Sequence, residues 1–163
     1  MAYIIRMLSL LESGESMKVF LSYGMNDVSE EDQKFMKAFL TRLVYVIFAD
    51  EKEIEIVSNE VMKGGPDDGR LYYLGGAIQK IDKCDVIIFS PNASNYSGCY
   101  IEHCVAEEYD KLSILLGYRT IVFADGSKLS LLTLTPEHLR NIINEHGGID
   151  NIVGISPMTF DNV

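Results

Sequence analysis

The chain has 163 residues, a length typical of a single domain. Hydrophobic residues make up 47% and charged residues 23%, a globular composition that argues against disorder. Acidic residues outnumber basic ones by 24 to 14 and give a formal net charge of −10. Binding to a nucleic acid duplex or to an anionic membrane depends on clustered Lys and Arg, so this balance argues against both partners.

The cysteines and the start of the chain favour a cytoplasmic setting. Cys84, Cys99 and Cys104 show no CxxC spacing and leave an odd thiol, which is typical of a reducing compartment. Met1–Leu11 is weakly similar to a signal peptide, but Arg6 interrupts the apolar stretch and no small-residue cleavage site is evident. No apolar run reaches the roughly 18 residues of a membrane helix. We therefore expect a cytoplasmic protein.

The domain is predicted to begin at Met17. The residues that follow, Lys18–Tyr23, are rich in β-formers and predict the first strand. Residues 1–16 are then expected to form an N-terminal extension, and residues 17–163 to form the domain.

The remaining elements alternate between strands and helices. Ser29 with Asp32 three residues later predicts a capped helix that runs to about residue 48. One further strand is expected within Ser113–Ala124, where Thr120–Ala124 and Ser113–Gly117 compete for the assignment. The other predicted elements are a strand at Glu53–Ser58, a long loop at Asn59–Arg70, a helix at Leu71–Lys83, a strand at Asp85–Ser90, a helix at Gly98–Tyr109 and a last helix from Thr135 to Gly147.

This alternation predicts an α/β fold, with an open parallel sheet and helices on both faces in a single domain. Ligands of such sheets bind beyond the carboxyl ends of the strands. The loops Ser22–Asp27, Asn59–Arg70 and Ser90–Gly98 are therefore expected to surround any site.

Motifs for common cofactors are missing from the sequence. There is no GxGxxG after the first strand and no GxxxxGK[ST], which argues against a dinucleotide site and a P-loop. Cys99 and His103 lie four residues apart on a predicted helix, but a metal site needs further ligands and none is placed to join them. We expect neither a metal nor another cofactor.

The start of the helix near residue 98 carries the candidate chemistry. Ser97 is predicted as its N-cap, and Gly98 allows a ligand to approach the first backbone N–H groups. A helix start favours an anion and holds a nearby carboxylate ionised. Glu102 lies about one turn further in, among apolar neighbours. Such a carboxylate is suited to attack an anomeric carbon, and the alternative is a solvated or ion-paired helix residue.

Three sequence blocks support the first interpretation: Met17–Asn26 (MKVFLSYGMN), Tyr73–Phe89 (YLGGAIQKIDKCDVIIF) and Ser97–Tyr109 (SGCYIEHCVAEEY). They resemble the nucleoside 2-deoxyribosyltransferase-like superfamily, and in particular a branch common in phage and bacterial genomes. The resemblance spans roughly residues 17–125, and the last block is the most specific. It implies a flavodoxin-like fold and a homo-oligomer.

The resemblance also implies roles for single residues. Glu102 matches the nucleophile that takes the deoxyribosyl group. Ser97 and Gly98 match a pair near the sugar or phosphate. The residues that match the turn in contact with the nucleoside are Ser22, Tyr23 and Gly24.

Two positions depart from the superfamily pattern. Characterised members carry Asp where this chain has Ala77 and often where it has Tyr96, and those acids position the base or handle its proton. Asp67 or Asp68 in the long loop, or a tyrosine, is a candidate replacement. Arg70 is the cation best placed for an anionic substrate, and Tyr73 is a candidate to stack on a base.

The resemblance thus implies cleavage of the N-glycosidic bond of a nucleoside or nucleotide, or 2-deoxyribosyl transfer, by a carboxylate nucleophile. Because the base-handling acids are replaced, a hydrolase acting on a nucleoside monophosphate fits better than base exchange. The same replacements favour the alternative, a non-catalytic module that senses or sequesters a nucleotide. A scaffold with a vestigial crevice is a third possibility.

Overall fold

The computed structural model describes residues 8, 16–48, 53–58, 69–132 and 134–156. A four-stranded parallel sheet with strand order β2-β1-β3-β4 lies at its centre. Its strands are β1 (Met17–Ser22), β2 (Ile54–Ser58), β3 (Val86–Phe89) and β4 (Leu112–Leu115). All four residues of β3 are buried, as expected for the apolar run at Asp85–Ser90. The predicted α/β class with a parallel sheet is confirmed.

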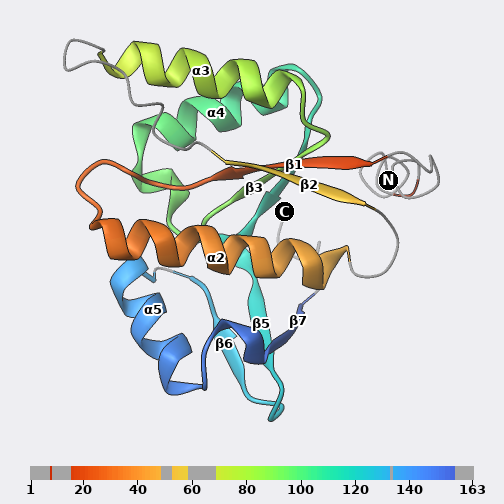
Figure 1. The fold of residues 1–163 in the computed structure, drawn as a ribbon, viewed down its shortest axis with the longest axis vertical. Helices are drawn as coiled ribbons and strands as arrows, with labels where there is room; N and C mark the ends of the chain where they lie inside the picture. Colours follow the sequence, from red (N-terminus) through yellow and green to blue (C-terminus); the bar gives the residue numbers. More distant parts are fainter. Residues whose placement is uncertain (1–7, 9–15, 49–52, 59–68, 133, 157–163) are drawn as a thin grey trace.

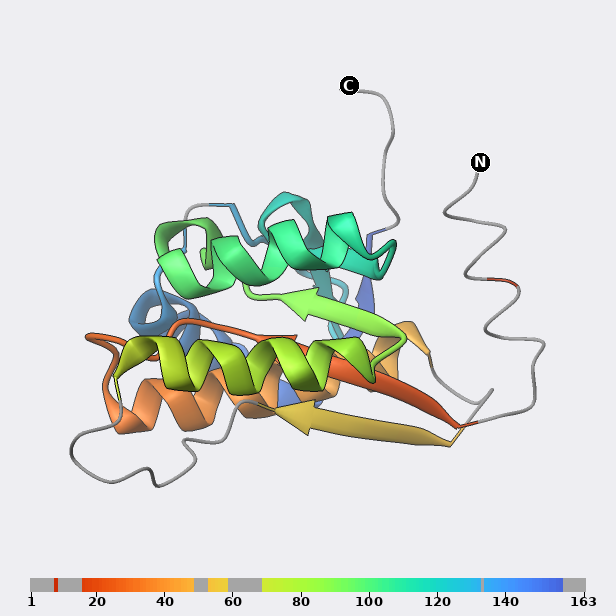
Figure 2. The same cartoon turned by 90° about the horizontal axis from the view of Figure 1, so that it is seen from above.

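Three helices pack against this sheet: α2 (Glu30–Ile47), α3 (Arg70–Asp82) and α4 (Ser97–Glu108). Figure 1 shows α2 on one side of the sheet, with α3 and α4 on the other, and Figure 2 shows the same layers from above. Successive side chains of a strand point to opposite faces. Accordingly, Val19 and Leu21 of β1 belong to the apolar cluster that includes α2, whereas Phe20 belongs to the cluster that includes α3 and α4.

A second, antiparallel sheet follows, with strand order β6-β5-β7. It contains β5 (Thr120–Phe123), β6 (Lys128–Ser130) and β7 (Ile152–Ile155), accompanied by α5 (Pro136–Glu145) and the short 3₁₀ turns η1 (Ala93–Asn95), η2 (Leu116–Tyr118) and η3 (Ile149–Asn151). The prediction of one strand within Ser113–Ala124 was wrong, because both competing segments form strands, as β4 and β5. Nothing in the sequence pattern predicted β6 or β7.

Helix α2 joins the two sheets. Its buried face, which includes Phe39 and Leu43, shares one apolar cluster with Leu139 of α5 and Ile152 of β7. The guanidinium of Arg42 also donates to the Ile152 carbonyl, at 2.9 Å from Nη2 and 3.1 Å from Nε. In Figure 1, α2 lies between the parallel sheet above and α5 with the second sheet below. The described part of the chain after β5 therefore completes the core.

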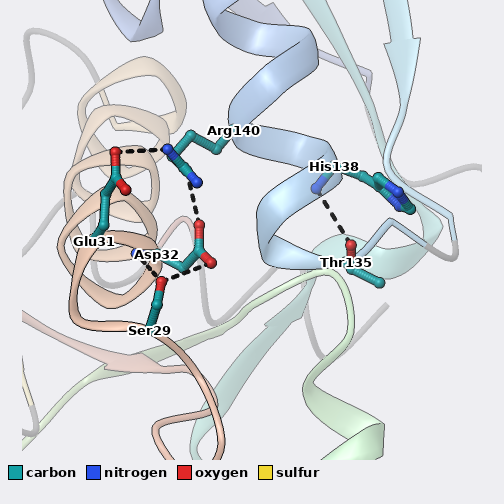
Figure 3. A network of polar contacts seen from close by, with 6 residues as sticks. All are labelled: Ser29, Glu31, Asp32, Thr135, His138 and Arg140. Carbon is teal, nitrogen blue, oxygen red and sulfur yellow. Dashed lines mark hydrogen bonds and ion pairs between the residues drawn. The ribbon is translucent and has the colours of Figure 1, made fainter.

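The predicted cap of α2 is confirmed and forms part of a polar network (Figure 3). The Ser29 hydroxyl accepts a hydrogen bond from the Asp32 N–H at 3.1 Å and donates to the Asp32 carboxylate at 2.8 Å. From α5, Arg140 donates through Nε to Asp32 at 2.8 Å and through Nη1 to Glu31 at 2.6 Å. The network fixes the start of α2 against α5.

We expect Arg140→Leu to lower the free energy of unfolding by about 1–3 kcal/mol, because the carboxylate of Asp32 loses a charged partner in a mostly buried position. Urea titration measures this loss. The control is Lys34→Ala, which removes an exposed ion pair with Glu30 and should leave the midpoint unchanged. Equal losses in the two variants would contradict the assignment.

Among the described helices, none combines the length and the apolar character needed to cross a bilayer.

Candidate functional site

A pocket of about 690 Å³ lies beyond the carboxyl ends of β1 and β3. It is lined by residues 23–26 after β1, Gln33 of α2, residues 71, 73 and 74 at the start of α3, and residues 96–99, 101 and 102 around the start of α4. The chain runs from β1 out to β2 and returns to β3 on the other side of β1, so the strand order reverses here. Open parallel sheets bind ligands at such a point, and the volume suits a small molecule.

Glu102 reaches this pocket from the inner face of α4. That face buries Cys99, Glu102 and Ala106, whose spacing of three and four residues defines one side of a helix. Glu102 is only 5% exposed, and it lines the pocket. Its carboxylate atom Oε2 accepts a hydrogen bond from the hydroxyl of Ser22, the last residue of β1. Its partner among the described residues is thus a hydroxyl group, not a Lys or Arg side chain.

Burial controls the protonation of Glu102. It raises the pKa of the carboxyl group from 4.5 to about 7, and the Ser22 hydrogen bond partly opposes this shift. The expectation that the helix start holds the carboxylate ionised was therefore wrong. The helix dipole acts within the first turn, whereas Glu102 is the sixth residue of α4 and has lost its hydration. Both protonation states are populated near neutral pH.

The cap of α4 also differs from the prediction. Its N-cap is Tyr96, not Ser97, and no side chain caps the helix. Tyr96 leaves the 3₁₀ turn η1 with extended dihedral angles, and its carbonyl accepts the first helical hydrogen bond, from the Tyr100 N–H at 3.0 Å. Ser97 is consequently the first helical residue.

The thiol beside Glu102 is held in its protonated form. Burial, together with the negative charge of Glu102, raises the pKa of Cys99 to about 12, and a hydrogen bond with Ser22 partly opposes this shift. Such a thiol is a poor nucleophile. Within the described ranges, no group of three or more His, Cys, Asp or Glu side chains lies together as a metal site requires.

The ring of Tyr96 packs so closely on Gly24 that it leaves no room for a side chain at this position. A Cβ atom at Gly24 would lie 2.3 Å from Cζ of that ring, and both residues line the pocket. Burial raises the pKa of the Tyr96 phenol, so the ring is neutral at physiological pH. One wall of the pocket is therefore formed by the ring of Tyr96 packed against the backbone of Gly24.

We expect Gly24→Ala to lower the free energy of unfolding by about 1–3 kcal/mol, because the ring of Tyr96 must move. In a Tyr96→Ala background the same change at Gly24 should lower the free energy of unfolding much less, a difference that a double-mutant cycle measures by urea titration. The control is Gly75→Ala in α3, where the added Cβ meets nothing within 4 Å. Additive effects of the two changes at Gly24 and Tyr96 would contradict the contact.

The structure brings together most of the predicted site. The residues found in the lining are Tyr23, Gly24, Tyr73, Ser97, Gly98 and Glu102. Ser22 does not appear among the described lining residues and instead binds the carboxylate of Glu102. Asp68 and the side chain of Arg70 lie outside the described part of the chain, as do nearly all of the N-terminal extension and of the loop Asn59–Arg70.

Met25, Asn26 and Tyr96 also line the pocket and lie in the predicted site loops Ser22–Asp27 and Ser90–Gly98, although no binding role was predicted for them individually. The lining residues outside the predicted loops were missed: Gln33, Leu71, Leu74, Cys99 and Ile101. For Leu71 and Leu74 a signal existed, since they flank Tyr73 at the start of a helix that follows a predicted site loop. Gln33 gave no signal. Its amide donates to the carbonyls of Met25 at 3.0 Å and Val28 at 2.9 Å, and so supports the turn after β1.

The fold and the site define an α/β protein with a pocket, lined in part by tyrosine rings, at the point where the strand order of its parallel sheet reverses. Of the described lining residues, Glu102 alone carries a carboxyl group, and none is Lys, Arg or His. No model of a protein family, no curated protein and no solved structure matches the chain.

Proposed function

We propose that this protein cleaves the N-glycosidic bond of a nucleoside or nucleotide, or transfers its 2-deoxyribosyl group, with Glu102 as the nucleophile. The observation that carries the proposal is a buried carboxyl group, held by Ser22, in a small-molecule pocket. Burial of such a group is unfavourable, and perturbed carboxyl groups in clefts are frequent at catalytic sites. The resemblance to the nucleoside 2-deoxyribosyltransferase-like superfamily supports the same role.

The reaction takes place in two displacements. A carboxylate oxygen of Glu102 bonds to the anomeric carbon while the carbon–nitrogen bond breaks and its electron pair leaves with the base, which takes a proton from water. Water, or a second base, then bonds to the anomeric carbon and gives up a proton to the hydroxide left by the first step, and the ester electron pair returns to the carboxylate.

The pocket walls suit an aromatic base. Tyr23, Tyr73 and Tyr96 line the pocket from three different segments, and aromatic rings of this kind stack on nucleobases. A nucleoside monophosphate remains the substrate that we favour, with its phosphate near Ser97 and Gly98. Cytoplasmic location and homo-oligomeric assembly belong to the same proposal and rest on composition and on the resemblance.

A non-catalytic nucleotide-binding module is the second candidate. Ala77 is fully buried in the cluster that includes Phe20 and Ile87, where an acid would be unfavourable, so the base-handling Asp has no counterpart there. A module of this kind binds nucleotides with measurable heat, and its Glu102→Gln variant binds as well as the wild type.

The test is incubation with a panel of deoxynucleosides and their 5′-monophosphates, with release of free base followed by chromatography. Wild type should release base from at least one compound, and Glu102→Gln should release none. Equal release from both proteins would exclude Glu102 as the nucleophile. Calorimetric binding with no base release by the wild type would favour the second candidate.

A further inference from the structure

Ser22 is not among the described residues that line the pocket, but its hydroxyl group donates a hydrogen bond to Glu102, which does line it. We propose that Ser22 is a positioning residue that holds Oε2 of Glu102 and thereby leaves Oε1 as the oxygen that bonds to the anomeric carbon. This inference rests on the proposed function and specifies which atom of the same site reacts.

The backbone of Ser22 is fixed in the sheet. Its carbonyl accepts a hydrogen bond from the Ser90 N–H at 2.9 Å, and it lies in register with Phe89 of β3. The side chain is 1% exposed and donates to Oε2 of Glu102. A hydroxyl group on such a rigid strand end holds one carboxylate oxygen in place. Since Glu102 itself lines the pocket, its other oxygen is the one left for a ligand.

Among the described groups around Glu102, the Ser22 hydroxyl is the one that favours the ionised carboxylate. Cys99 on the same helix stays protonated, and the phenols of Tyr23, Tyr73 and Tyr96 share the pocket without a described cation. Of the elements packed on α4, β4 and η1 contain no ionisable side chain. The described ionisable side chains of α3 are Tyr72, Tyr73, Lys80 and Asp82, and none of them is a cause of the shift in the pKa of Glu102. A hydrogen bond donated to a carboxylate lowers its pKa, and Ser22 acts in this direction on Glu102.

The assignment gives each oxygen one role in the two displacements. The lone pair of Oε1 forms the ester bond to the anomeric carbon, and Oε2 becomes the ester carbonyl while it still accepts from Ser22. When water attacks the anomeric carbon, it loses a proton to the solvent, the bond to Oε1 breaks and the electron pair returns to the carboxylate. The Ser22 hydroxyl keeps its proton throughout and stabilises the charge that returns.

The experiment compares Ser22→Ala with Ser90→Ala. Ser90 is the matched control because it follows the neighbouring strand β3, is also buried, and its hydroxyl has no hydrogen-bond partner among the described residues. The first readout needs no substrate: the carboxyl carbon of Glu102 is titrated by NMR in protein labelled with ¹³C at the glutamate Cδ. Ser22→Ala should raise the pKa of Glu102 by about one pH unit, and Ser90→Ala should not change it.

The second readout is the pH profile of kcat/KM with whichever panel compound releases base. Its acidic limb should move to higher pH in Ser22→Ala by the amount that NMR measures, an effect that a structural defect alone does not produce. Ser22→Cys, which keeps a weaker donor, should shift both readouts less and serves if Ser22→Ala does not fold.

The two failures are distinguishable. An unchanged Glu102 titration in Ser22→Ala, with base release by the wild type intact, would overturn the role of Ser22 alone. A shifted titration without base release by the wild type would overturn the proposed function and, with it, the assignment of the reacting oxygen.

Discussion

Glu102→Gln should become more stable than the wild type as the pH rises. The pKa of Glu102 is about 7 in the folded protein, against 4.5 for the free side chain. Below pH 4.5 the group is protonated in both the folded and the unfolded state, so its titration has no effect on stability. Above about pH 7 it is ionised in both, and the buried charge lowers the free energy of unfolding by about 3 kcal/mol. The free energy of unfolding of the wild type therefore falls between pH 4.5 and about pH 7. The Glu102→Gln variant has no ionisable group at this position and should not show this fall.

Urea unfolding at pH 5 and pH 8 measures the effect as the difference between variant and wild type at each pH. Glutamine retains an oxygen that accepts from Ser22 and has nearly the same volume, so the difference should grow toward pH 8 in favour of the variant. Glu108→Gln is the control, since it makes the same change of net charge at an exposed position of the same helix. Parallel pH profiles for wild type and Glu102→Gln would contradict the buried ionisation.

The parts of the fold that the sequence predicted correctly are those encoded locally. The start of α2 was predictable because Ser29 and Asp32 satisfy backbone groups within one turn. The strand β3 was predictable because it is buried on both faces and its whole sequence is apolar. By contrast, β6 has three residues with exposed ends, and β7 contains a glycine. Each forms a strand because it pairs with β5, which lies between them in the sheet. Such pairing depends on contacts between distant parts of the chain, so local sequence patterns do not predict it.

The site divides in the same way. That Glu102 lies on the inner face of its helix follows from its spacing to Cys99 and Ala106, and that the loops after β1 and β3 meet follows from parallel topology. The hydrogen bond between Ser22 and Glu102 was not predictable, because the two residues lie 80 positions apart and their contact depends on side-chain packing, although both were expected at one site. Nor was the direction of the pKa shift, because desolvation depends on the packed neighbours and the helix dipole depends only on position.

Turnover should depend on Glu102 more strongly than on any other residue of the pocket. Glu102→Gln should lower kcat by at least about 10³-fold, because an amide cannot form the glycosyl ester. Binding of an unreactive nucleoside analogue should change little, since the amide oxygen still accepts from Ser22. The kcat values of wild type and variant are compared from time courses of base release, with the panel compound that the wild type cleaves. Glu108→Gln is the control and should keep the wild-type kcat.

The pH dependence then separates two roles for the same carboxyl group. A nucleophile acts in its ionised form, so kcat/KM of the wild type should rise with pH and reach its plateau above about pH 7, where Glu102 has lost its proton. On the proposed function, activity should therefore be highest in the pH range where the ionised Glu102 lowers the stability of the fold most, because both effects follow from one buried charge. A rate that falls as the pH rises through 7 would instead identify the protonated carboxyl group as a general acid, and the covalent step would have to be abandoned.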